Sequence, residues 1–411
     1  MKKTSVLSKS KKLAYLLFMV YVIAYIGRHN YSAALTEIVA SGLFTKAEAG
    51  IIGTVYFASY GSGQIIFGCI SDRFSPYKLI TFGLFGAALS NFSMMLAPNI
   101  TAMTIFWGLN GISQSILWPA SFYLISNIMA KEYRTRACLI MSVAVPVGTI
   151  LAYFISGTAI KSGWKAAFLC PSLILAVMGT VFVFLSSYFK KSLKKEEKKS
   201  IEKKEKSSSK IFFKALVSSG VIILFIPVLL HGMLRDGLTA WVPTMIRETY
   251  GTDTSLSVFV SVVLPVINLS GAYISMLIYE KLTKNNEVTA GFISLLLGII
   301  PMIILLFLKR INMYTSVFSL AFATTCMTSF NHIILTVLPL KFAKFGKAST
   351  LTGTLNALTY AGCASSNLVF GFTSEHWGWS STVIIWLSIF VIAAIITATV
   401  IKKWKDFKNS N

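Results

Sequence analysis

Charged residues are scarce in this sequence, and acidic residues are the scarcest of them. Charged side chains make up 13% of the 411 residues, whereas hydrophobic side chains make up 55%. Soluble globular domains carry about 25% charged residues, so this composition excludes a water-soluble protein and indicates an integral membrane protein. In such a protein every ionisable group inside an apolar segment is informative.

The chain also lacks the residue patterns of disulfide, metal and catalytic sites. Its five cysteines show no paired spacing and fall in separate apolar segments: Cys69, Cys138, Cys170, Cys326 and Cys363. No nucleophile–base set, metal-ligand spacing or phosphate-binding glycine loop occurs. We therefore expect no enzyme activity, no metal and no cofactor. The first apolar segment has no small-residue cleavage site, so we expect it to stay attached.

Long apolar runs are what the sequence has in abundance. Runs of about 20 residues are long enough to cross ~30 Å of hydrocarbon. We expect twelve such spans, at 13–35, 48–70, 78–97, 101–129, 137–159, 166–189, 213–245, 255–280, 288–308, 313–339, 349–373 and 380–401. The predicted fold class is an all-α membrane protein of twelve transmembrane helices.

A lysine-rich stretch divides these spans into two sets of six. Residues 190–210 contain ten lysines and four glutamates, a composition that cannot bury a core. We interpret the stretch as a cytoplasmic charged linker between two pseudo-symmetric six-helix bundles, at 1–189 and 211–411.

The distribution of lysine and arginine predicts the orientation in the membrane. Basic residues near span ends stay on the cytoplasmic side, and they gather at the N-terminus, in the linker and in the C-terminal tail. We therefore expect a multi-pass protein of the cell (cytoplasmic) membrane with both termini in the cytoplasm. The net charge of +23 is spread over loops beside the membrane, so its expected partners are lipid head groups and not nucleic acid.

Two arginines interrupt the apolar spans. Arg28 lies about sixteen residues into the first span, and Arg235 lies within the seventh. A charge at such depth is costly and usually faces a partner or a substrate. The only carboxylate in the span cores is Asp236, which an α-helix would point about 100° away from Arg235. An anionic substrate is therefore the favoured partner, and neutralisation by a buried carboxylate is the structural alternative.

Hydrogen-bonding side chains recur at helical spacing near these arginines. Residues three or four positions apart share a helix face, which groups Tyr25 with Arg28 and His231 with Arg235. The other candidates for the same binding site are His29, next to Arg28, and residues of the second, fourth and eleventh spans: Tyr60, Gln64, Gln114, Trp118 and Tyr360.

The loop after the second span carries a motif with a physical role. In "GCISDRFSPYK", Gly68 permits close helix approach, and Asp72 at a helix end can pair with basic groups. Together with Arg73 and Lys78, these residues resemble the loop motif of the major facilitator superfamily between spans two and three. The resemblance implies two six-helix halves and alternating access.

Three further segments are similar to one branch of that superfamily. "YIGRHN", "NGISQSILWP" and "LRDGLTAWVPT" resemble the organophosphate:phosphate antiporters, which carry glycerol phosphate and hexose phosphates. In that family one arginine of span one and one of span seven bind the phosphate, which implies these roles for Arg28 and Arg235. The chain departs from the family at His29, at Gln64, which replaces a lysine, and in the fifth span, which lacks a histidine. Its pocket is thus less positive.

Three functions are compatible with these residues. The first is exchange of an organic phosphate, such as a sugar phosphate or glycerol phosphate, for inorganic phosphate by a monomeric carrier. The second is proton-coupled symport of a sugar acid or another carboxylate, with Asp236, His231 and His332 as coupling candidates. The third is a transporter-like receptor for a sugar phosphate.

Overall fold

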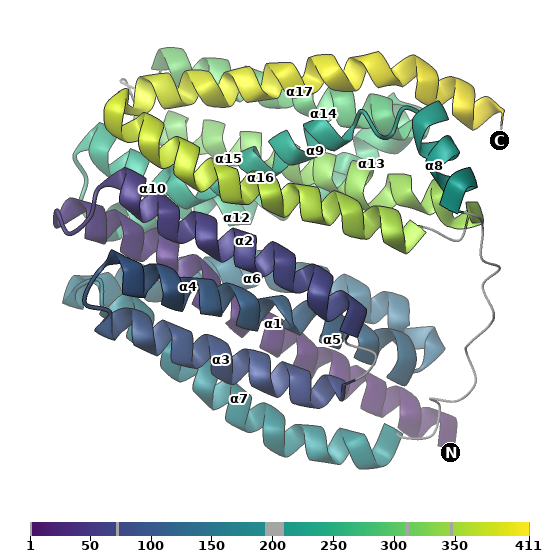
Figure 1. The fold of residues 1–411 in the computed structure, drawn as a ribbon, viewed down its shortest axis with the longest axis horizontal. Helices are drawn as coiled ribbons and strands as arrows, with labels where there is room; N and C mark the ends of the chain where they lie inside the picture. Colours follow the sequence, from purple (N-terminus) through teal and green to yellow (C-terminus); the bar gives the residue numbers. More distant parts are fainter. Residues whose placement is uncertain (1, 71–73, 194–208, 309–311, 346–347, 411) are drawn as a thin grey trace. The chain divides into compact units, whose positions relative to one another are not determined.

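The computed structural model describes residues 2–70, 74–193, 209–308, 312–345 and 348–410 (Figure 1). This described part consists of helices and short turns and contains no β-strand, which confirms the all-α class for these residues. The first helices are α1 (Lys2–Ala40), α2 (Lys46–Ile70), α3 (Pro76–Leu96), α4 (Ile100–Ser115), α5 (Leu117–Tyr123), η2 (Leu124–Ile128), α6 (Lys131–Ala159), η3 (Ile160–Ser162) and α7 (Ala166–Leu193).

Many of the later helices are short, and π-helical or 3₁₀ turns occur between several of them. They are α8 (Ser209–Ser218), α9 (Phe225–Gly232), η4 (Met233–Gly237), α10 (Leu238–Tyr250), α11 (Thr254–Ser261), α12 (Val263–Asn268), α13 (Gly271–Leu277), η5 (Ile278–Leu282), α14 (Glu287–Leu308), α15 (Met313–Asn331), η6 (His332–Val337), η7 (Leu338–Phe345), α16 (Ala348–His376) and α17 (Gly378–Asn409).

Side-chain caps explain where several helices begin. The amide oxygen of Asn99 accepts a hydrogen bond from the backbone N–H of Ala102 at 2.9 Å, at the start of α4. The carboxylate of Asp253 accepts one from the N–H of Leu256 at 3.1 Å, at the start of α11. Such caps satisfy backbone donors that have no partner within the helix. α10 ends at Gly251, whose φ of 64° is left-handed and favours glycine.

The contacts divide the chain into two compact units. Unit 1 comprises Met1–Phe44, Val55–Glu202 and Asp253–Val262, and unit 2 comprises Thr45–Thr54, Lys203–Thr252 and Val263–Asn411. The units differ from the expected bundles in two exchanged segments, the first turns of α2 and all of α11. The boundaries of the two bundles therefore stay a prediction, and most of the 190–210 linker lies outside the described residues.

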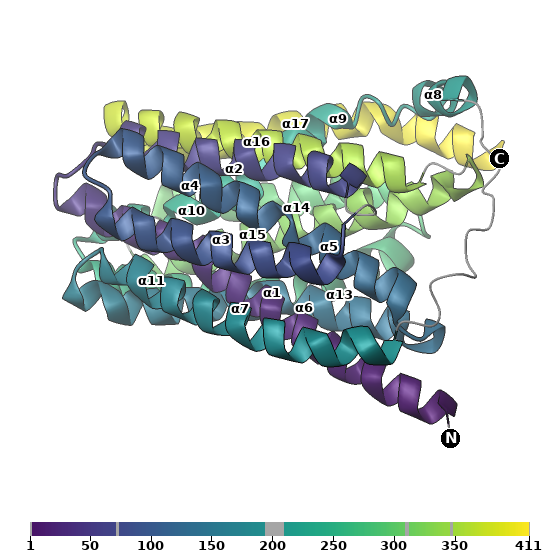
Figure 2. The ribbon, with the colours of Figure 1, turned by 60° about the horizontal axis from the view of Figure 1, so that its bottom comes forward.

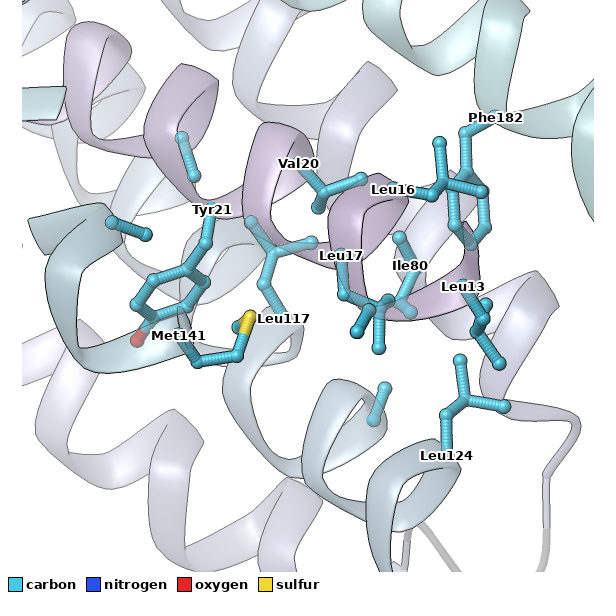
Figure 3. Close-up of a cluster of buried hydrophobic side chains, with 14 of the residues drawn as sticks. Leu13, Leu16, Leu17, Val20, Tyr21, Ile80, Leu117, Leu124, Met141 and Phe182 are labelled. Carbon is cyan, nitrogen blue, oxygen red and sulfur yellow. The ribbon is translucent and has the colours of Figure 1, made fainter. Parts of the chain in front are cut away.

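The core of unit 1 surrounds the first half of α1. Leu13, Leu17 and Val20 are fully buried there, and they belong to one apolar cluster with Ile80 of α3 and Phe182 of α7 (Figure 3). α3 and α7 run side by side (Figures 1 and 2). Close packing of this kind fixes the rotation of α1 about its axis. It therefore also fixes the direction of the side chains two turns later, where Arg28 lies.

In unit 2 the backbones of α9 and α16 touch through glycine. A Cβ atom on Gly232 would lie 2.0 Å from the carbonyl oxygen of Thr359, and one on Gly362 would lie 2.0 Å from that of Leu229. Only residues without a side chain permit this approach, as is common between membrane helices. The contact places the turn after Gly232, which carries Arg235, against α16.

Eight helical stretches of the described part are long and apolar enough to cross a membrane. The four expected spans outside this set are 48–70, 101–129, 213–245 and 349–373, which correspond to α2, α4 to η2, α8 to α10, and α16. These four carry most of the polar site candidates, which lower their apolar character. Large apolar side chains such as Phe184 and Phe307 are exposed on the outside of the helices, as expected for contact with lipid.

The expectation of one continuous helix over 213–245 is wrong. α8 ends at Ser218, Gly220 adopts a left-handed φ of 74°, and α9 begins at Phe225. The left-handed residue breaks the helical path, and glycine adopts this conformation without steric cost. The seventh helical segment therefore starts at Phe225 and continues through η4 to Tyr250.

Candidate functional site

Arg28 lies inside unit 1 with four aromatic rings around its guanidinium group. The Cζ atom is 4.6 Å from the ring centroid of Tyr60, 5.3 Å from those of Tyr25 and Phe57, and 5.7 Å from that of Tyr56. Arg28 as a whole is 6% exposed. Each ring lies within the ~6 Å over which a cation is attracted to an aromatic face. We call Arg28 and these four residues the arginine cage.

The cage is built by helical spacing on two helices. Tyr25 lies one turn before Arg28 on α1, and Tyr56, Phe57 and Tyr60 follow one another on α2. Tyr56 is held in turn by Trp107 of α4, with ring centroids 5.2 Å apart. This contact restrains the ring of Tyr56 beside the guanidinium group.

Gln64 supports the cage from one turn further along α2. Its Nε2 donates to the hydroxyl oxygen of Tyr60 at 3.0 Å and to the carbonyl oxygen of Ser115 at 3.4 Å. Gln64 thus orients the ring nearest to Arg28.

Three side-chain amides converge on the backbone just before Arg28. The carbonyl oxygen of Gly27 accepts hydrogen bonds from Asn110 at 3.0 Å, Gln114 at 3.0 Å and Asn91 at 3.2 Å. The Oε1 of Gln114 also accepts from the hydroxyl of Tyr56 at 3.3 Å. Gln114 therefore directs its polar atoms toward α1 and the cage, where it holds Arg28 in place.

A row of aromatic rings extends from the cage in both directions. His29 stacks on Tyr25 with centroids 5.5 Å apart, and Tyr25 lies 5.4 Å from Tyr21. Trp118 of α5 follows at 5.3 Å from Tyr21. The structure thus connects His29 and Trp118 to the cage through Tyr25 and Tyr21.

Arg235 of unit 2 is bound by the adjacent carboxylate. Its Nη2 donates to Oδ2 of Asp236 at 2.7 Å, and its Nε donates to Oδ1 at 3.1 Å. The expectation that Asp236 points away from Arg235 is wrong. Both residues lie in the π-helical turn η4, whereas the expectation assumed a regular α-helix.

Asn331 of α15 joins Arg235 to His231. The Nη1 of Arg235 donates to Oδ1 of Asn331 at 3.0 Å, and Nε2 of His231 lies 3.2 Å from the same oxygen. Because an arginine can only donate, the amide oxygen must face it. The same oxygen then accepts from His231, whose Nε2 therefore carries a proton. His231 is fully buried.

α16 contributes the remaining neighbours of the Arg235 pair. The thiol of Cys363 lies 3.3 Å from Oδ2 of Asp236 and 3.2 Å from the carbonyl oxygen of Gly232. Tyr360 is half-buried and lies one turn before Cys363 on this helix. His332 faces elsewhere, since its Nδ1 lies 2.8 Å from the hydroxyl of Ser275 on α13.

The expected loop motif is only partly described. Asp72 and Arg73 lie outside the described residues, Gly68 belongs to α2, and Lys78 is exposed in the first turn of α3. Among the residues with described positions, no group of three His, Cys, Asp or Glu side chains is arranged to hold a metal ion.

Sequence reasoning missed three neighbours of the two arginine sites, two that contact an arginine and one, Cys363, that contacts Asp236. From the sequence, Phe57 is an ordinary apolar residue of a span, and Cys363 is a small apolar residue with no indicated role. Asn331 is a polar residue in an apolar helix, a signal that points to a buried partner. The partner itself, Arg235, is 96 residues away in the chain.

Comparison with known proteins gives the family. The Major Facilitator Superfamily model matches residues 17–366. A probable hexose phosphate transport protein of Chlamydia trachomatis is 30% identical over 42% of this chain, and the match spans 38% of that relative. The glycerol-3-phosphate transporter of Bacillus subtilis is 24% identical over 93% of this chain and 90% of its own. The membrane sensor protein UhpC of Escherichia coli is 23% identical over 39% of this chain and 36% of its own.

Solved structures agree on the fold. A bacterial homologue of the human lysosomal transporter Spinster superposes with a TM-score of 0.82 at 14% identity, over 97% of this chain and 98% of the other. The nucleoside transporter NupG superposes with a TM-score of 0.72 at 14% identity, over 94% of this chain and 98% of the other. With its multi-pass helical architecture and a family match over most of its length, the chain belongs to the Major Facilitator Superfamily.

Proposed function

We propose that this protein carries a small organic phosphate, such as a sugar phosphate or glycerol phosphate, across the membrane in exchange for inorganic phosphate. Relatives named as hexose phosphate and glycerol-3-phosphate transporters support the substrate class. The observation that carries the proposal is the pair of arginines inside apolar spans, Arg28 in the first expected span and Arg235 in the seventh. Each is held by a network of side chains from neighbouring helices, Arg28 by aromatic rings and Arg235 by Asp236 and Asn331.

Guanidinium groups suit the chemistry of a phosphate. The planar fork presents N–H donors at the spacing of two phosphate oxygens, and charge-assisted bonds of this kind are about twice as strong as neutral ones. In the proposal Arg28 and Arg235 both bind the phosphate. The organic part of the substrate contacts five further side chains: Tyr25, His29, Tyr60, Trp118 and Tyr360. Gln64 and Gln114 position the arginine cage.

The transport cycle and the setting complete the proposal. The carrier works as a monomer by alternating access, and the motif of Gly68, Asp72, Arg73 and Lys78 stabilises one of its states. It lies in the cytoplasmic membrane among lipids, with both termini in the cytoplasm.

A thermal-shift screen of the purified protein tests the substrate class. Inorganic phosphate, glycerol phosphate, hexose phosphates and sugar acids are compared for wild type and Arg28→Ala. Stabilisation by the phosphates that disappears in Arg28→Ala is the expected result, because removing the guanidinium removes its bonds to the anion. Stabilisation by sugar acids alone would contradict the proposal.

Proton-coupled symport of a carboxylate is the second candidate. It is favoured by the smaller number of basic residues near the expected site. The organophosphate:phosphate antiporters carry basic residues at two positions where this chain has His29 and Gln64. Asp236 would have to release Arg235 to take up a proton. The test is uptake driven by a pH gradient into vesicles without phosphate, whereas exchange of labelled phosphate that ignores the gradient would exclude symport.

A receptor for a sugar phosphate is the third candidate. It is favoured by the relatives named membrane sensor protein UhpC. A sensor kinase gene beside the gene for this chain would support it, and a catabolic operon would support transport.

A further inference from the structure

We propose that Asp236 is an internal counter-ion that replaces the transported anion on Arg235 whenever the carrier is empty. The empty carrier can then change conformation, so that net transport accompanies exchange. This inference rests on the proposed function, and it concerns unit 2 alone.

The hydrogen bonds of Arg235 show which of its donors are already taken by protein groups. A guanidinium group has five N–H donors. Asp236 takes one on Nε and one on Nη2, at 3.1 and 2.7 Å, and Asn331 takes one on Nη1 at 3.0 Å. The edge formed by Nε and Nη2 is one of the two edges on which a guanidinium group can bind a phosphate in a bidentate way. A phosphate that binds there must displace the carboxylate of Asp236.

The pair is reachable and has an alternative arrangement. The side chains of Arg235 and Asp236 are 24% and 17% exposed, so neither is sealed in the core. The thiol of Cys363 lies 3.3 Å from Oδ2 of Asp236, which gives the displaced carboxylate a donor that stays in place. The π-helical turn that holds the pair is a type of irregularity often found at functional sites.

The pair also determines which states of the carrier can change conformation. An arginine without a counter-ion is costly inside a membrane protein, and either a bound anion or Asp236 supplies that counter-ion. With Asp236 present, both the loaded and the empty carrier have a neutralised Arg235 during the conformational change. Without Asp236, only the loaded carrier does.

Asp236→Asn tests the proposal because it removes the charge and keeps the shape. We expect the variant to bind inorganic phosphate at least tenfold more tightly than wild type, since the competing carboxylate is gone. In vesicles, net uptake of labelled phosphate should fall at least tenfold more than exchange does. Net uptake is measured into vesicles without internal phosphate, and exchange is measured into vesicles loaded with phosphate. In both assays potassium and valinomycin hold the membrane potential at zero.

Two further variants control for structural damage. Asp236→Glu restores the charge and should return the ratio of net uptake to exchange toward the wild-type value. Asn331→Asp places a second carboxylate on Nη1 of Arg235 and should weaken phosphate binding at least tenfold. This change in affinity is opposite in direction to the change expected for Asp236→Asn. If Asp236→Asn does not fold, as judged by size-exclusion chromatography, unchanged binding in Asn331→Asp overturns the proposal.

The outcomes separate this inference from the proposed function. Unchanged phosphate affinity in Asp236→Asn, or an equal loss of net uptake and exchange, overturns the counter-ion role while wild-type exchange stands. If wild type neither binds nor exchanges phosphate, the proposed function fails and the inference fails with it.

Discussion

Replacing Tyr60 with leucine should weaken the binding of inorganic phosphate by removing the ring nearest to Arg28. The Cζ atom of Arg28 lies 4.6 Å from this ring, and Arg28 is 6% exposed. A cation–π contact in such a desolvated setting contributes about 1–2 kcal/mol to holding the guanidinium group in place, so its loss lowers the affinity by at most about five- to thirty-fold. The three other rings of the cage remain, so the protein should still fold.

Tyr60→Phe is the matched control because it keeps the ring and removes only the hydroxyl. That hydroxyl accepts the bond from Gln64, which retains its second acceptor, the carbonyl oxygen of Ser115. A single such bond contributes about 0.5 kcal/mol at the low end, so we expect a loss of about two- to three-fold. Titration calorimetry of the purified proteins with phosphate measures both. Equal affinities for Tyr60→Leu and wild type would refute the role of the cage.

Two further predictions concern packing. Glu287→Ala should lower the stability of the fold by on the order of 3 kcal/mol, because the fully buried carboxylate accepts hydrogen bonds from Tyr279 at 2.8 Å and Trp404 at 3.0 Å. Melting curves test this prediction. A phosphate affinity more than twofold different from wild type would contradict a purely structural role. Gly362→Ala should reduce phosphate exchange at least tenfold, because the new Cβ would lie 2.0 Å from the carbonyl oxygen of Leu229. Gly353→Ala is the control, since its Cβ would meet nothing within 4 Å. Equal exchange by both variants would refute the close contact between α9 and α16.

Contacts within one helix were predictable from the sequence. Spacing of three and four residues places Tyr25 beside Arg28 and His231 beside the Arg235 site, and the structure confirms both. The same rule failed for Asp236, because it assumes α-helical geometry and the chain forms a π-turn at this point. Periodicity alone does not reveal a π-turn.

Contacts between helices were less predictable. Gln114 stays a predicted substrate residue, and the hydrogen bond from its amide to the backbone of Gly27 on another helix had no signal in the sequence. Phe57, Asn331 and Cys363 gained their importance only from residues distant in the chain. The fold class followed from apolar length, whereas the break at Gly220 depended on one backbone angle.

Phosphate exchange by conservative arginine variants tests the central claim most directly. Vesicles loaded with phosphate are assayed for exchange of labelled phosphate with Arg28→Lys, Arg235→Lys and the control Arg136→Lys, whose side chain is exposed. Lysine keeps the charge but loses the bidentate fork, so each of the first two variants should lose at least about tenfold. The control should match wild type. Near-normal exchange by Arg28→Lys or Arg235→Lys would contradict the account.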